Sequence, residues 1–209
     1  MTVKSIDINQ RIPLSILETA LFTFLNDEYS EEYILELLYT EFTGENRIKK
    51  ALRIVNKIVL NNPLKDFLLD NKEQLLIALR NRTDKNVILI SLLNSAYSFS
   101  HFTLETLGKL FTAQSMVSKE SLNRHIGKQY GSNRGTENAL YSVIPMFLDA
   151  DLFSRPRIGF YEFQSAVIIQ NPITCQLYRE SNIIIHGSMA NDNSPYFLFI
   201  DQSRIYEFS

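Results

Sequence analysis

The chain has 209 residues, of which 45% are hydrophobic and 21% charged, and its net charge is −2; these values exclude a disordered, fibrous or strongly basic protein. The single cysteine, Cys175, excludes an internal disulfide and favours a reducing, cytoplasmic setting. The first residues lack a signal-peptide pattern and no apolar run approaches the length of a membrane span, so we expect no membrane association.

The small net charge hides a strong segregation along the chain. Residues 1–44 carry 2 basic and 8 acidic side chains, and residues 161–209 carry 2 basic and 5 acidic. Residues 45–85 carry 10 basic and 5 acidic, and residues 118–160 carry 6 basic and 4 acidic. Binding of a polyanion depends on the local field rather than on net charge. The two basic segments are therefore candidates for nucleic-acid contact, and a chance excess of positive charge is the alternative.

Residues 1–98 are predicted to form a helical bundle domain. Apolar residues recur at helical spacing over residues 14–27 and again after Ser30, which is a good N-cap, and Gly44 is expected to end the second helix. One or two short helices should follow Pro63. Asp84 is the expected N-cap of an apolar helix at the centre of the core.

The most regular helical pattern covers residues 45–60. Its apolar face is formed by Ile48, Leu52, Val55 and Val59. Its basic stripe is formed by Arg47, Lys50, Arg53 and Lys57. The stripe is a candidate phosphate-binding surface, and a solvated helix face is the alternative.

Residues 99–181 are predicted to form a winged-helix-like domain. A helix opened by Ser100 or Thr103 should be followed by a helix starting at Ser118 and by a third helix capped by Thr136. The stretch SRPRIG, residues 154–159, then reads as the tip of a hairpin. This is the order of a winged helix-turn-helix, whose third helix reads the major groove. The fold class expected is therefore mainly α: a helical bundle, a winged helix-turn-helix and a short β-rich tail.

Several side chains of this second domain have the chemistry of DNA contacts. Asn suits adenine, Arg suits guanine, and basic side chains on neighbouring elements suit phosphates. The candidates are Arg124, Lys128, Asn133, Arg134, Thr136, Asn138, Arg155 and Arg157. Glu137 opposes phosphate at the same helix start. Docking of a partner protein is the main alternative, and a dimeric transcription regulator is another.

The remaining residues predict neither catalysis nor a metal or cofactor site. The three histidines, His101, His125 and His186, are scattered and lack metal-ligand spacing, so each is expected at or near the surface. Cys175 lacks the surroundings of a nucleophile. Residues 182–209 contain short apolar and aromatic runs and are predicted to form a β-rich tail. We expect a non-enzymatic protein.

Six segments in this order resemble the A-protein (BrxA-like) family of BREX phage-defence systems. They are NRIKKALRIVNKIV, NPLKDFLLDNKEQLLIA, NVILISLLNSAYSF, SKESLNRHIGKQY, TENALYSVIPMFLDADLF and IIQNPITCQLY, which together span about residues 30–180. The resemblance implies an all-helical first half like that of an RNA-binding antitermination factor, and a winged helix in the second. It also implies binding of double-stranded DNA, with RNA as a further candidate, and a role beside other defence-system proteins. The chain differs in having no tryptophan.

Overall fold

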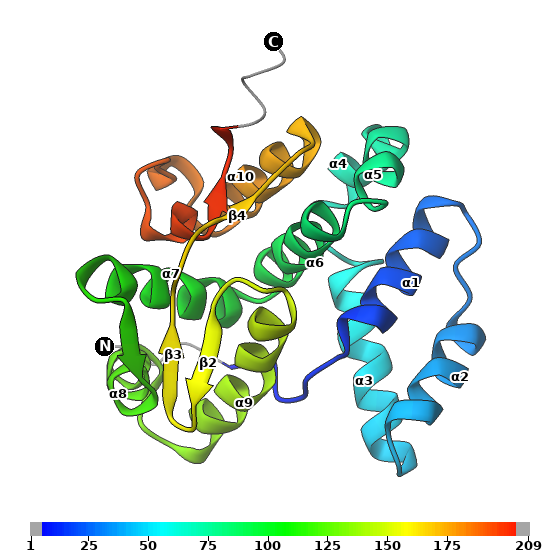
Figure 1. Cartoon of the computed structure of the whole chain (residues 1–209). Coiled ribbons are helices and arrows are strands. Elements are labelled where there is room, and N and C mark those ends of the chain that lie inside the picture. Colours follow the sequence, from blue (N-terminus) through cyan, green and yellow to red (C-terminus); the bar gives the residue numbers. More distant parts are fainter. Residues whose placement is uncertain (1–5, 204–209) are drawn as a thin grey trace.

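A computed structural model describes residues 6–203 and is mainly helical (Figure 1), which confirms the predicted α class. The first half contains six helices: α1 (Leu14–Leu25), α2 (Glu31–Glu41), α3 (Glu45–Ile58), α4 (Lys65–Asp70), α5 (Lys72–Ala78) and α6 (Arg82–Ala96). Ser30 caps α2 as predicted, since its side chain accepts a hydrogen bond from the backbone N–H of Tyr33. Gly44 does not end α2. It precedes α3 with φ 90°, a left-handed value that favours glycine.

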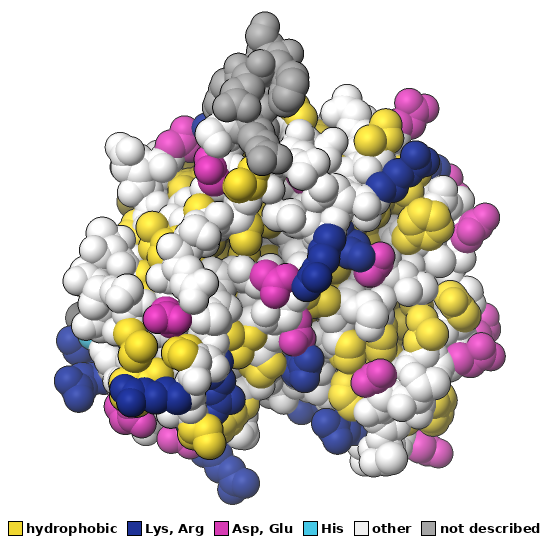
Figure 2. Space-filling view, in the orientation of Figure 1, with side chains coloured by type: hydrophobic (Ala, Val, Ile, Leu, Met, Phe, Trp, Pro, Cys, Tyr) yellow, Lys and Arg dark blue, Asp and Glu magenta, His cyan; other side chains and the backbone are white. Residues whose placement is uncertain are grey.

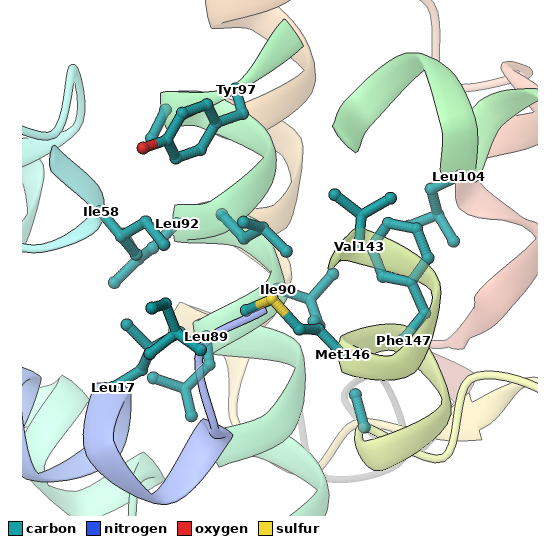
Figure 3. Close-up of a cluster of buried hydrophobic side chains, with 14 of the residues drawn as sticks. Leu17, Ile58, Leu89, Ile90, Leu92, Tyr97, Leu104, Val143, Met146 and Phe147 are labelled. Atoms are coloured by element: carbon teal, nitrogen blue, oxygen red, sulfur yellow. The ribbon is translucent and has the colours of Figure 1, made fainter. Parts of the chain in front are cut away.

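Helix α6 is the centre of the core. Figure 3 shows Leu89 and Leu92 of α6 facing Leu17 and Ile58, while Ile90 faces α9 on the other side. Each of these side chains is essentially inaccessible to solvent. One continuous cluster of buried residues joins all parts of the chain from Ile8 to Ile200, so the segments predicted as separate units share one hydrophobic core.

The prediction that Asp84 caps this helix is wrong. Asn81 is the N-cap, and its side chain accepts hydrogen bonds from the backbone N–H groups of Thr83 and Asp84. Asp84 is fully buried instead, and its carboxylate accepts the backbone N–H of Gln170 at 3.3 Å and that of Asn171 at 3.1 Å. A buried carboxylate needs such donors, so Asp84 ties the start of α6 to the chain entering the last helix.

The second half begins with a helix, a short strand, two helices and a hairpin. The elements are α7 (Ser98–Ala113), β1 (Met116–Ser118), α8 (Lys119–Tyr130), α9 (Arg134–Asp149), β2 (Ser154–Arg157) and β3 (Phe160–Glu162). Strand β3 lies between β1 and β2 and pairs antiparallel with both. Gly159 has φ 81° in the hairpin turn, as the glycine predicted at the tip requires.

Two predicted helix starts in this half are wrong. Helix α7 begins at Ser98 rather than at Ser100 or Thr103, both of which are buried inside it. Asn133, not Thr136, caps α9, because the Asn133 side chain accepts the N–H of Thr136 at 3.1 Å. Ser118 caps α8 as predicted.

The predicted β-rich tail is largely wrong. Residues 183–186 continue α10 (Pro172–His186), and η1 (Gly187–Met189) and η2 (Pro195–Phe199) are 3₁₀ turns. Among the described residues of this tail, 182–203, only β5 (Ile200–Asp201) is a strand, and it pairs parallel with β4 (Val167–Ile168). The segment predicted as a last strand, 204–208, lies outside the described residues.

Within residues 6–203, no single helix is long and apolar enough to cross a membrane. Helices α6 and α7 pass that test only as a pair, which is bent by 119°. Most of their residues are buried against the rest of the protein.

Candidate nucleic-acid interface

A cleft of about 790 Å³ separates α3 from α9 and is floored by the N-terminal segment. The residues lining it are Asn9, Gln10, Arg11, Pro13, Glu41, Phe42, Asn46, Arg47, Lys50, Asn138, Tyr141 and Ser142. Figure 2 shows Lys and Arg side chains along the lower part of this face, near the β2–β3 hairpin, α9 and α3. The cleft thus brings the basic helix predicted from residues 45–60 beside the third helix of the second half.

Arg47 and Lys50 are the basic side chains of α3 that line this cleft. Arg47 lies over the ring of Phe42, with 4.8 Å from its guanidinium carbon to the ring centroid. Within residues 6–203 neither side chain makes an ion pair with a carboxylate. Gly44 offers no side chain to cap α3, so the positive end of the helix dipole adds to the potential at the cleft.

The other two residues of the predicted stripe are placed differently. Arg53 is exposed on α3 but does not line the cleft. Lys57 forms an ion pair with Asp7 and lies over the ring of Tyr97 at 4.1 Å. Its charge is already neutralised within the protein, so Lys57 is the weakest of the four as a phosphate contact.

Most of the predicted contacts in the second half are exposed on the helices and hairpin around α9: Arg124, Lys128, Asn133, Arg134, Asn138, Arg155 and Arg157. Thr136 is the exception. It is 3% exposed, and its hydroxyl donates to the backbone oxygen of Gly131 at 2.6 Å. Thr136 therefore holds the turn between α8 and α9 and has no surface for a base contact. Asn133 is exposed, but its side-chain oxygen is occupied by capping.

A pair of side chains absent from the predicted set joins α8 to α9. Lys119 donates to the hydroxyl of Tyr141 at 2.7 Å and lies over the same ring at 4.5 Å. The hydrogen bond to Tyr141 raises the pKa of Lys119. Tyr141 is 60% exposed on the cleft side of α9.

Negative charge is present at the same place. Glu41 lines the cleft, and Glu137 is exposed in the first turn of α9. Both carboxylates would repel a phosphate group, so they oppose the positive charge of Arg47 and Lys50.

The prediction of scattered surface histidines is wrong for His101. This side chain is fully buried in α7 and its ring centroid lies 5.1 Å from that of His186, at the end of α10. The pairing joins residues 85 positions apart in sequence, which no local spacing reveals.

Comparison with protein-family models, curated proteins and solved structures gives no match.

Proposed function

We propose that this protein binds duplex DNA without catalysing a reaction. The binding surface would be a winged helix-turn-helix formed by α7 to β3, together with the N-terminal half of α3. The element order, helix, strand, two helices and hairpin with β3 between β1 and β2, supports this assignment. In it α9 is the recognition helix and the β2–β3 hairpin is the wing.

One observation carries the proposal: Arg47 and Lys50 of α3 line the same cleft as Asn138 and Tyr141 of α9. Two segments that are both basic in sequence thus contribute side chains to one cleft. The cleft is too small to admit a duplex. One sugar–phosphate strand would instead lie along its mouth, with Arg155 and Arg157 on the wing meeting the phosphates beyond.

The exposure of the side chains on α9 limits which of them could contact the bases of the duplex. Asn138 is exposed one turn into the helix, while Asn133 is engaged in capping. Base readout in this proposal falls to Arg134 and Asn138, and the remaining basic residues fix affinity without sequence preference. A role in a phage-defence complex rests on the resemblance alone.

Docking of a protein partner is the second candidate, and a specific observation favours it. A hollow of about 80 Å³ between α8, α9 and the wing is lined by Leu122, Leu140, Ile144, Leu148 and Tyr161, with Lys119 and Arg155 at its edge. An apolar floor with charged edges is typical of a small anchor site for a side chain of a partner.

A salt titration separates these two functions. We expect wild-type protein to bind a fluorescent 30-base-pair duplex with an affinity that falls linearly with salt on logarithmic axes, by about 0.9 in slope per phosphate neutralised. The variant Arg155→Ala/Arg157→Ala should lower that slope by roughly 2, whatever the duplex sequence.

The matched control removes two basic residues elsewhere. Lys65→Ala/Arg80→Ala takes the same charge from α4 and from the end of the α5 region, away from the cleft, and should leave the slope unchanged. Absence of duplex binding even at about 50 mM salt would reject the DNA function. Tighter binding of single-stranded DNA or double-stranded RNA in the same assay would show that this nucleic acid, and not duplex DNA, is the preferred ligand.

A further inference from the structure

The end of α10 meets α7 in a cluster of three potential metal ligands. His101 and Glu105 lie one turn apart on α7, and His186 is the last residue of α10. One ligand atom from each of the three lies within 4.8 Å of the other two. The cluster lies on different elements from the cleft and has no part in the proposed DNA contacts.

Two ring nitrogens of the cluster have no hydrogen-bond partner although both are buried. They are Nδ1 of His101, which has no partner among the described residues, and Nε2 of His186, which lies 3.4 Å from Oε1 of Glu105 without hydrogen-bond geometry. A buried polar atom left unpaired costs free energy. Two such atoms beside one carboxylate point to a ligand that accepts lone pairs.

Neighbouring residues orient His101 for this role. Its Nε2 lies 3.2 Å from the side-chain oxygen of Asn182, which can only accept, so Nε2 carries the proton and Nδ1 carries the lone pair. The ring is also stacked on Tyr196 at 4.2 Å between centroids. Such support from outside the ligand set is typical of metal-binding histidines.

Glu105 supplies the third potential ligand, a carboxylate oxygen next to His186. Its Oε1 lies 3.4 Å from Nε2 of His186 and accepts the hydroxyl of Ser194 at 2.7 Å. The side chains of His186 and Glu105 are 29% and 22% exposed. His101 is fully buried, so an ion held here would have His101 on its inner side.

We propose that His101, Glu105 and His186 bind one divalent transition-metal ion, of which zinc fits the ligand types best. Two imidazoles and one carboxylate with an open fourth position is an established zinc ligand set. Tetrahedral bonds of about 2.0–2.1 Å would bring the ligand atoms to roughly 3.3 Å apart, so binding would draw His186 toward α7. His186 ends its helix and Gly187 follows it with φ 55°, so the movement is confined to the end of α10. The ion would fasten that end, and with it η2, to α7.

Isothermal titration of Zn²⁺ into the chelator-stripped full-length protein tests this site. We expect about one equivalent to bind, and we expect His186→Ala and Glu105→Gln each to weaken the affinity at least 10-fold. Both changes fall on partly exposed side chains, so the fold should persist, which circular dichroism would check. Zn²⁺ should also raise the melting temperature of the wild type but not that of His186→Ala.

Two further variants test whether zinc binding depends on the three proposed ligands and not on another histidine or the cysteine. His125→Ala removes the histidine whose Nδ1 contacts the backbone oxygen of Ser121 on α8, and Cys175→Ser removes the only thiol. Both should bind zinc like the wild type. No binding by folded wild-type protein would overturn the proposal, as would an affinity unchanged in His186→Ala or lost in Cys175→Ser. Duplex binding is measured separately, so failure of either proposal is distinguishable from failure of the other.

Discussion

Reversing the charge of the cleft in Arg47→Glu/Lys50→Glu should weaken binding of duplex DNA about 100-fold at about 0.1 M salt. Each phosphate contact adds about 0.9 to the slope of log affinity against log salt concentration. At about 0.1 M salt, one power of ten below 1 M, the loss of two contacts alone therefore lowers the affinity by nearly two powers of ten. The new carboxylates add repulsion beside Glu41. Fluorescence anisotropy at fixed salt measures the loss directly.

The control for this change is Lys65→Glu/Arg80→Glu. Both residues are exposed, Lys65 on α4 and Arg80 after α5, and neither lines the cleft, so the net charge changes equally while the site does not. We expect the control to bind within about 5-fold of wild type, because exposed distant charges are screened. Equal losses in both variants would mean that overall charge, not the cleft, governs binding.

A single methyl group at Gly108 should destabilise the fold by about 3 kcal/mol, an effect typical of overpacking against rigid backbone. A Cβ at this position of α7 would lie 2.0 Å from the carbonyl oxygen of Pro195 and 2.8 Å from its carbon. Those atoms open η2, which packs along α7 and buries Tyr196 and Phe199. Gly108→Ala would gain about 1 kcal/mol of helix propensity, and the expected loss is net of that gain.

Urea denaturation of Gly108→Ala beside Gly127→Ala measures this effect. Gly127 is also inside a helix, but a Cβ there meets first the Oγ of Ser132 at 2.3 Å, a short side chain that can rotate away. We expect Gly127→Ala to stay within about 1 kcal/mol of wild type. Equal stability of the two variants would show that η2 is not held against α7 as described.

The sequence predicted local features of this fold better than contacts between distant parts of the chain. Ser30, Ser118 and the glycine of the hairpin tip have the predicted roles because each depends on a few adjacent residues. Asn133 and Thr136 are both good N-cap residues, and local sequence cannot rank them. In the structure the Thr136 hydroxyl donates a hydrogen bond to the backbone oxygen of Gly131, which turns Thr136 inward, and Asn133 is the N-cap.

The prediction of a strand at residues 183–185 is wrong because it also rests on local sequence alone. Three consecutive isoleucines favour a strand by propensity, yet they extend a helix that begins at Pro172. That helix buries Ile173, Leu177 and Ser181 along one face against the body, and packing overrides the preference of its last turn.

The two candidate sites depend on contacts between distant parts of the chain. The cleft needs α3 beside α9, and the histidine cluster needs the end of α10 beside α7. The basic stripe signalled Arg47 and Lys50 in advance. No spacing in the sequence signalled that Tyr141 would face them, or that His101 would meet His186.

The most direct test of the central claim, that duplex DNA lies along the cleft between α3 and α9, is protection of lysines from amine modification. The reaction would be followed by mass spectrometry with and without saturating duplex, comparing Lys50 in the cleft with Lys65 on α4. We expect the duplex to slow modification of Lys50 at least several-fold and to leave the modification rate of Lys65 unchanged. A duplex that binds while Lys50 reacts at its free rate would contradict it.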